Sequence, residues 1–175
     1  VFGCLDTDND GYSNNGDRFP FENSQWNDTD GDGYGDNSNG FQADACYLLG
    51  GSSSLDRYGC IDTDKDGYSD PDNTWFKHPL GLADAFPSDS TQSRDTDGDG
   101  YGDMVLGFEG DNCPTIHGAS VIDRFGCLDS DEDGYSNIGD DLPNNPTQWL
   151  DRDGDGFGDN QSGTEPDVFP TDGTQ

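Results

Sequence analysis

The sequence is poor in apolar residues, in positive charge and in long hydrophobic runs. Only 28% of its 175 residues are hydrophobic, and 7 Lys and Arg stand against 38 Asp and Glu, a formal net charge of −31. Ordering a residue costs roughly 1 to 2 kcal/mol of backbone entropy, which so little apolar surface does not offset by burial. A conventional core is therefore excluded. No run approaches the roughly 18 residues of a membrane span, and an acidic surface repels nucleic acid and anionic membranes.

The acidic residues are almost all aspartate, since the chain has only four glutamates: Glu22, Glu109, Glu132 and Glu165. Disordered acidic chains favour Glu, Pro, Ser and Lys, whereas Asp and Gly at fixed spacing are typical of oxygen-ligand cation sites. The five cysteines form no Cys-x-x-Cys pair. They indicate disulfides in an oxidising compartment rather than zinc, and so an extracellular or cell-surface location.

Two kinds of Asp-rich loop alternate along the chain. First loops read Asp-x-Asp-x-Asp-Gly-Tyr-Ser and begin at Asp6, Asp62 and Asp129; second loops read Asp-x-Asp-Gly-Asp-Gly-aromatic-Gly-Asp and begin at Asp28, Asp95 and Asp151. They predict repeat units at 1–46, at 47–113 with an insertion at about 73–83, and at 114–175, which includes the start of a next unit. We expect the chain to be a window of a longer tandem array.

The loops match the spacing of calcium ligands. In a twelve-residue calcium loop the ligands come from positions 1, 3 and 5, the carbonyl at 7, position 9 and an acid at 12. Positions 1, 3 and 5 are Asp6, Asp8, Asp10, Asp62, Asp64, Asp66, Asp129, Asp131 and Asp133 in the first loops, and Asp28, Asp30, Asp32, Asp95, Asp97, Asp99, Asp151, Asp153 and Asp155 in the second. Position 7 carbonyls belong to Tyr12, Tyr34, Tyr68, Tyr101, Tyr135 and Phe157, and position 9 is Asn14, Asp36, Asp70, Asp103, Asn137 and Asp159.

The residue that closes each loop varies in its distance along the chain. Asp17 and Asp140 stand at position 12 of their loops. In the middle unit position 12 is Asn73, so either Asp84, across the insertion, or Asp72 closes that loop. The second loops also lack an acid at position 12, and the predicted closing ligands lie eight residues beyond the last Asp of each loop: Asp44, Asp111 and Asp167.

Six such clusters in one chain favour calcium over solvated turns. Three or four carboxylates in one short loop repel one another strongly without a cation. Calcium takes six to eight oxygens in a flexible geometry, whereas magnesium demands a strict octahedron and is the second choice. We predict about six calcium ions or more.

The Asp-x-Asp-x-Asp-Gly loops, with Asp111-Asn112-Cys113-Pro114 and Asp44-Ala45-Cys46, resemble thrombospondin type 3 repeats. The resemblance implies a chain wrapped around a string of calcium ions, with disulfides between neighbouring loops. We expect an elongated, mostly irregular fold with short strands and little hydrophobic core. The equal 14-residue spacings favour disulfides Cys46–Cys60 and Cys113–Cys127 over a pairing of Cys4 with Cys46 and Cys60 with Cys113. EF-hands are excluded because Gly and Pro interrupt every flanking helix.

The expected function is structural: a rigid extracellular stalk, or a fibre subunit that associates with itself. The alternative is a calcium-dependent adhesin or a spacer module of a secreted multidomain protein. We expect no enzyme, because His78 and His117 lie beside no nucleophile and are expected to be plain surface residues. Asn27-Asp28-Thr29 and Asn160-Gln161-Ser162 match the N-glycosylation pattern, so glycans on Asn27 and Asn160 are possible.

Overall fold

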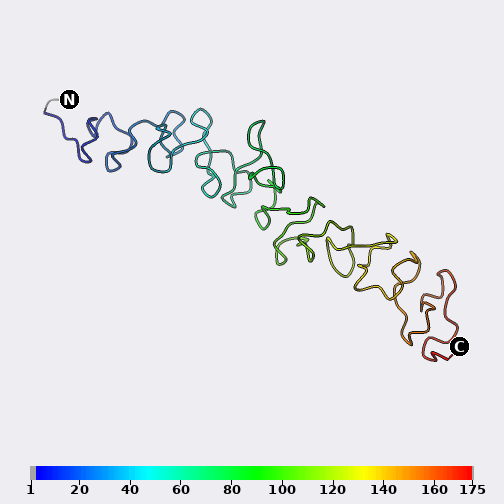
Figure 1. Ribbon diagram of the computed structural model, residues 1–175. Coiled ribbons are helices and arrows are strands. Elements are labelled where there is room, and N and C mark those ends of the chain that lie inside the picture. The colour runs from blue at the N-terminus through cyan, green and yellow to red at the C-terminus, as the bar shows by residue number, and fades with distance from the viewer. Residues whose placement is uncertain (1–2, 175) are drawn as a thin grey trace. The chain divides into compact units, whose positions relative to one another are not determined.

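The computed structural model describes residues 3–174. Over that range the chain forms no helix and no extended strand, and Figure 1 shows neither coiled ribbons nor arrows. Strand-like pairing is confined to five isolated parallel bridges: Gly35 with Ala43, Asp44 with Tyr58, Lys77 with Ala83, Gly102 with Gly110, and Gly158 with Pro166. The irregular fold is confirmed, but the expected short strands are reduced to single bridges. Glycine occupies three of the five, and glycine weakens a strand interior.

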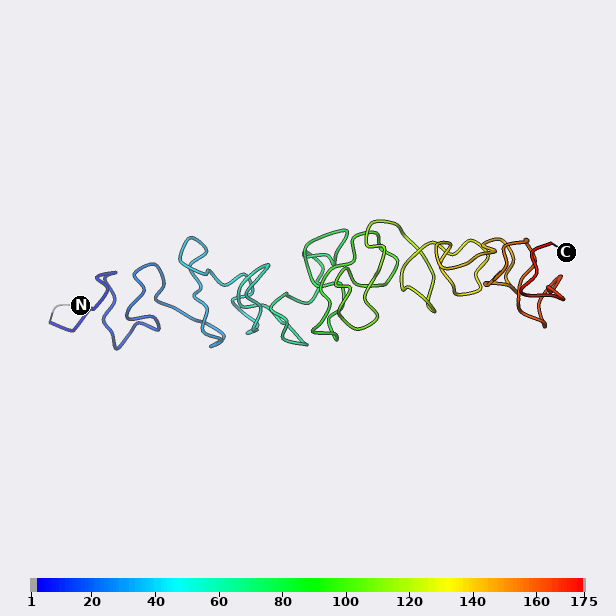
Figure 2. The same cartoon turned by 90° about the horizontal axis from the view of Figure 1, so that it is seen from below.

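The chain divides into two compact units, Val1–Ser93 and Arg94–Gln175. Within each unit it passes from one small loop to the next, as both views show (Figures 1 and 2). The first unit holds the Asp-rich loops that begin at Asp6, Asp28 and Asp62, and the second holds those at Asp95, Asp129 and Asp151. Residues 3–174 include no helix long and apolar enough to cross a membrane.

The buried side chains are polar rather than apolar. Among the described residues the buried hydrophobic ones are Cys60, Ala83, Ala85 and Cys127. The buried polar or charged ones are Asp17, Gln25, Asp44, Ser53, Asp62, Ser69, Asp84, Gln92, Asp95, Asp111, Ser120, Ser136, Asp140, Gln148 and Asp167. Large apolar side chains lie outside; Leu106, for example, is 95% exposed. The expectation of little hydrophobic core is confirmed.

Each Asp-rich loop needs two left-handed backbone positions. Position 6 is glycine in all six loops, with φ between 94° and 100°. Position 4 is glycine in the second loops but Asn9, Lys65 and Glu132 in the first, with φ of 63°, 68° and 65°. These left-handed residues turn the chain so sharply that successive carboxylates face the same side.

A buried glutamine braces the turn that follows a second loop. Gln25, 1% exposed, donates from Nε2 to the carbonyls of Asn37 and Phe41, both at 3.1 Å, and its Oε1 accepts the Asn37 N–H at 3.0 Å. Gln148, 0% exposed, makes the same three bonds in the other unit, at 2.8 to 3.2 Å. One side chain therefore satisfies three backbone groups of the turn.

Replacing Gln148 by leucine is expected to lower the free energy of unfolding of the second unit by at least about 2 kcal/mol, because each buried polar group left without a partner costs about 1 to 3 kcal/mol. Chemical denaturation in calcium measures the change. Thr171→Leu is the control, because Thr171 is exposed and only its backbone N–H is bonded, to Phe169. Equal stability of the two variants would contradict the bracing role.

Two disulfides, Cys46–Cys60 and Cys113–Cys127, confirm the predicted pairing, each between cysteines 14 residues apart. A fully buried serine supports each one: Ser53 Oγ accepts the Cys60 N–H at 2.9 Å, and Ser120 Oγ accepts the Cys127 N–H at 3.0 Å. Cys4 is exposed and has no disulfide partner among residues 3–174.

Aromatic residues at loop position 7 pack on an aromatic residue just before the next loop. Tyr12 stacks on Trp26 and Tyr135 on Trp149, both with centroids 5.3 Å apart and planes within 9°. Two tilted pairs, Tyr34 with Tyr58 and Tyr101 with Phe125, occupy the equivalent place where a disulfide segment follows. These pairs join consecutive loops within each unit.

Candidate metal centres

Backbone amides set the direction of the loop carboxylates. In the loop at Asp28, both oxygens of Asp28 accept N–H groups, from Gly31 at 2.6 Å and from Gly33 at 3.2 Å. Asp30 accepts the N–H of Asp32 at 3.3 Å, and Asp32 accepts that of Tyr34 at 2.9 Å. The same bonds recur at 2.7 to 3.3 Å in the loop at Asp129. At positions 3 and 5, each bond fixes one oxygen and leaves the other oxygen of the carboxylate available for a further contact.

The carboxylates at positions 1, 3 and 5 lie close together in four loops. One oxygen from each of three residues lies within 4.8 Å of the others in the groups Asp6, Asp8 and Asp10; Asp28, Asp30 and Asp32; Asp62, Asp64 and Asp66; and Asp129, Asp131 and Asp133. Several oxygens at position 3 of the six loops are buried and have no hydrogen-bond partner: Oδ2 of Asp8, Asp30, Asp64, Asp97 and Asp131 and both oxygens of Asp153. Buried polar atoms normally have partners.

The predicted closing aspartates share one unusual state. In all six, Oδ1 accepts the N–H two residues ahead at 2.6 to 2.7 Å, and the acceptors are Asp17, Asp44, Asp84, Asp111, Asp140 and Asp167. In five of them, Oδ2 is buried without a hydrogen-bond partner: Asp17, Asp44, Asp84, Asp111 and Asp167. Their exposed fractions are only 1% to 8%. Those five each present one buried, unpartnered oxygen next to a group of like charges.

The structure separates the two candidates for closing the loop at Asp62. Asp84, 1% exposed, lies near Asp66 and Asp64, whose charges help to raise its pKa. Asp72 instead pairs with Arg57 at 2.8 Å and accepts the side-chain and backbone groups of Thr74, so its pKa is lowered. The insertion thus loops out and returns at Asp84.

Electrostatics within the clusters are unfavourable without a cation. Burial, reinforced by repulsion from the loop carboxylates, raises the pKa of Asp84 to about 7 and those of Asp44 and Asp111 to about 6. Burial also raises the pKa of Asp140 and of the position 3 residue Asp97. The ordinary pKa of an aspartate carboxyl group is 3.8. The folded arrangement therefore favours either a proton or a bound cation at each cluster.

This shift predicts an inverted pH dependence for the calcium-free protein. Because the folded pKa of Asp84 lies near 7 and those of Asp44 and Asp111 near 6, the folded state binds more protons than the unfolded state. The stability that these three carboxyl groups contribute is fully present below their unfolded pKa of about 4. It is lost as the pH rises through their folded pKa values. We expect the calcium-free chain to be more compact at about pH 4 than at about pH 8. Hydrodynamic radius across that range is the measurement, and expansion on acidification would contradict the expectation.

The position 9 side chains turn back to their own loop. Asn14 accepts the N–H of Thr7 at 2.9 Å, and both oxygens of Asp70 accept bonds from Thr63, at 3.0 and 2.6 Å. The remaining members, Asp36, Asp103, Asn137 and Asp159, contact position 2 in the same way. We assign these side chains to bracing the loop. The position 7 carbonyls stay a prediction.

Two aspartates that the sequence analysis left out lie against the loops. Asp56 accepts the N–H and hydroxyl of Ser69 at 2.9 and 2.6 Å, and Asp123 accepts those of Ser136, both at 2.7 Å. Burial first, then neighbouring carboxylates that include Asp56, raise the pKa of Asp66. The available signal was the repeated Asp-Arg-aromatic-Gly-Cys before the first loops, at 56–60 and 123–127.

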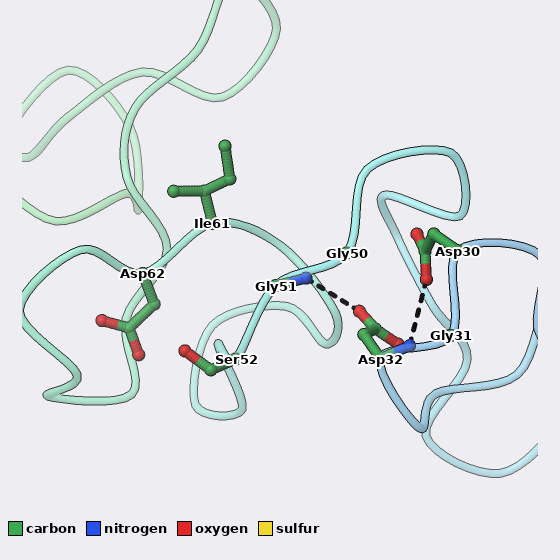
Figure 3. A pocket seen from close by; sticks show the side chains of 8 residues that line it. All are labelled: Asp30, Gly31, Asp32, Gly50, Gly51, Ser52, Ile61 and Asp62. Atoms are coloured by element: carbon green, nitrogen blue, oxygen red, sulfur yellow. Dashed lines mark hydrogen bonds between the residues drawn. The ribbon is translucent and has the colours of Figure 1, made fainter.

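The segment after a closing aspartate also reaches the loop. The N–H of Gly51 donates to Asp32 Oδ2 at 2.9 Å, and Figure 3 shows this bond beside the one between Asp30 and the backbone of Asp32. Gly118 makes the matching bond to Asp99 at 3.0 Å. A hollow at this place in the first unit is lined by Asp30, Asp32, Gly50, Gly51, Ile61 and Asp62, among others.

No model of a known protein family matches this chain, and no curated protein matches it. The assignment of a function therefore depends on the loops themselves.

The side-chain amides of the two predicted glycosylation residues are hydrogen-bonded. The Asn27 Nδ2 donates to Thr29 Oγ1 at 3.2 Å and to Asp36. The Asn160 Nδ2 donates to the Thr147 carbonyl at 2.8 Å. A glycan at either position would replace these bonds, and glycosylation stays a prediction.

Proposed function

We propose that this chain is an extracellular structural protein that binds about six calcium ions, one in each Asp-rich loop, and that these ions hold its fold. The observation that carries the proposal is the closing aspartate: five times over, a residue at least 92% buried presents an unpartnered Oδ2 to a group of loop carboxylates. A buried charge without a partner is strongly unfavourable. A divalent cation at each cluster removes that cost.

The donor set favours calcium. Oxygens at positions 1, 3 and 5, the closing Oδ2 and the position 7 carbonyl would supply five ligands, and water would complete the six to eight that calcium takes. The closing residue enters 11, 16 or 22 positions after the start of the loop, at Asp17, Asp44 and Asp84 for example. Such variable closure suits a cation with flexible geometry better than magnesium. Six ions would change the formal charge from −31 to −19.

The stalk or fibre role follows from how neighbouring loops are joined. Gln25 and Gln148 brace the turn after a second loop. In each unit a disulfide lies in the segment that leads from a second loop to the next first loop. Arrays stabilised between nearest neighbours suit extended architecture. Two disulfides support an oxidising, extracellular setting. Exposed apolar side chains such as Phe21, at 83%, offer area for self-association.

Native mass spectrometry of the chain in calcium, combined with electron microscopy of concentrated samples, tests the proposal. We expect about six bound ions per chain and filaments with regular lateral contacts. A folded chain without calcium would overturn the metal assignment. Six ions on a persistently monomeric chain would retain calcium and overturn the fibre role.

The second candidate, a calcium-dependent adhesin or spacer, is favoured by the insertion. This segment breaks the repeat and exposes Phe76, Leu80 and Leu82 at 55%, 86% and 58%, which a uniform fibre has no evident need for. Binding of a glycan or protein by the monomer, lost when residues 73–82 are shortened, would support this candidate.

A further inference from the structure

One loop carries a nitrogen donor that its structural counterpart lacks. Asp97, Asp99 and His117 place one ligand atom each within 4.8 Å of one another. His117 lies six residues after the closing Asp111, and the residue six after the closing Asp44 is Gly50. In that matched loop the position also lies against the carboxylates, since a Cβ on Gly50 would stand 3.2 Å from the Asp32 Cβ.

A backbone contact of the following residue holds His117 at the loop. The N–H of Gly118, the next residue, donates to Asp99 Oδ2 at 3.0 Å, and the N–H of Ile116 donates to the Cys113 carbonyl at 2.8 Å. His117 itself is exposed, so its ring is reachable by an ion from solvent.

The same cluster contains the buried, unpartnered group that indicates a ligand. Asp111 is 1% exposed, its Oδ2 has no hydrogen-bond partner, and the charges of Asp99 and Asp97 bear on it. Asp97 Oδ2 is likewise buried and unpartnered. Two loop carboxylates and one imidazole therefore lie together, with the buried Asp111 carboxylate near enough to feel both loop charges. The loop at Asp28 has a glycine in place of the histidine.

We propose that His117, Asp97, Asp99 and Asp111 form a transition-metal site, at which a divalent ion of the zinc type replaces calcium. Carboxylate and carbonyl oxygens suit calcium, whereas imidazole suits zinc, copper, iron and nickel. Zn²⁺ binds both kinds of ligand at about 2.0 to 2.2 Å. Donors already within 4.8 Å converge on one ion through small side-chain rotations. The proposal rests on the proposed function in that the loop holds a cation.

Zinc titration of the full chain in saturating calcium tests this site by calorimetry. We expect one tightly bound Zn²⁺ in the original chain and at least tenfold weaker binding in His117→Gly, since loss of even outer-shell partners costs about 10- to 100-fold. The reciprocal variant Gly50→His is expected to bind a second Zn²⁺ in the loop at Asp28. Unchanged zinc affinity in His117→Gly would overturn the proposal.

Two further measurements keep the test decisive. Imidazole ¹⁵N resonances of the original chain should shift on zinc binding for His117 and not for His78; an unmoved His117 overturns the proposal whatever the folding of the variants. The calcium count by native mass spectrometry separates the two hypotheses. If the chain binds its calcium ions but the His117 resonances do not shift with zinc, only the zinc site is contradicted. If the chain binds no calcium, the proposed function is contradicted.

Discussion

Removing calcium with a chelator at neutral pH is expected to unfold the protein while both disulfides stay intact. The buried side chains are polar, and the buried hydrophobic residues among those described are two alanines and two cysteines. A site whose dissociation constant lies a thousandfold below the calcium concentration contributes about 4 kcal/mol. Folded proteins have net stabilities of only about 5 to 15 kcal/mol. Loss of several sites therefore exceeds what the remaining interactions sustain.

Tryptophan fluorescence and hydrodynamic radius measure this unfolding. Trp26 and Trp149 stack on Tyr12 and Tyr135, which belong to the loops themselves, so their emission reports loop order in each unit directly. Restoring calcium should restore both signals. Magnesium at the same concentration is the control and should restore less, because it demands an octahedral site. A compact chain with unchanged fluorescence after chelation would contradict metal-driven folding.

The sequence predicted most of the loop geometry because the aspartates of each loop are close together in the sequence. Positions 1, 3 and 5 follow from spacing alone, and the closing Asp44, Asp111 and Asp167 from a register shared by three loops. The disulfides followed from equal spacing as well. Asp84 was left open against Asp72 because the insertion has no second copy to supply a register. In the structure Arg57 pairs with Asp72, which favours Asp84 as the closing residue.

Interactions between distant polar residues were harder to predict. Asparagine and aspartate at position 9 suit a ligand and a brace equally, and only the bonds to position 2 distinguish them. Glutamine is mostly exposed in proteins, so the burial of Gln25 and Gln148 contradicts its usual behaviour. Their repetition in register was the available sign. The expected short strands became single bridges because glycines stand in the pairing segments, at Gly102 and Gly158 for example.

Replacing Asp84 by asparagine is expected to remove one calcium ion and to lower the stability of the first unit in calcium by about 4 kcal/mol, if the full contribution of one well-saturated site is lost. Asparagine keeps an oxygen for the Phe86 N–H, which Asp84 accepts at 2.7 Å, but it lacks the negative charge that faces Asp64 and Asp66. Native mass spectrometry counts the ion, and thermal unfolding in calcium measures the loss.

In chelator the same substitution is expected to have the opposite sign. The pKa of Asp84 is raised to about 7 by burial and by the loop carboxylates, so a neutral side chain there relieves repulsion in the metal-free fold. The variant should then expand less than the original chain at about pH 8. A residue that acted only through packing would not change sign with calcium.

Asp72→Asn is the matched control, because Asp72 lies in the same unit and was the competing ligand. It loses an ion pair with Arg57 whose side chains are 13% and 43% exposed. Such a partly solvated pair contributes at most about 1 kcal/mol, and the calcium count should not change. Loss of an ion in Asp72→Asn with retention in Asp84→Asn would reverse the ligand assignment. Retention of the ion in both variants would show that the loop binds calcium without a closing carboxylate. The buried Oδ2 of Asp84 would then no longer be evidence for a calcium ligand.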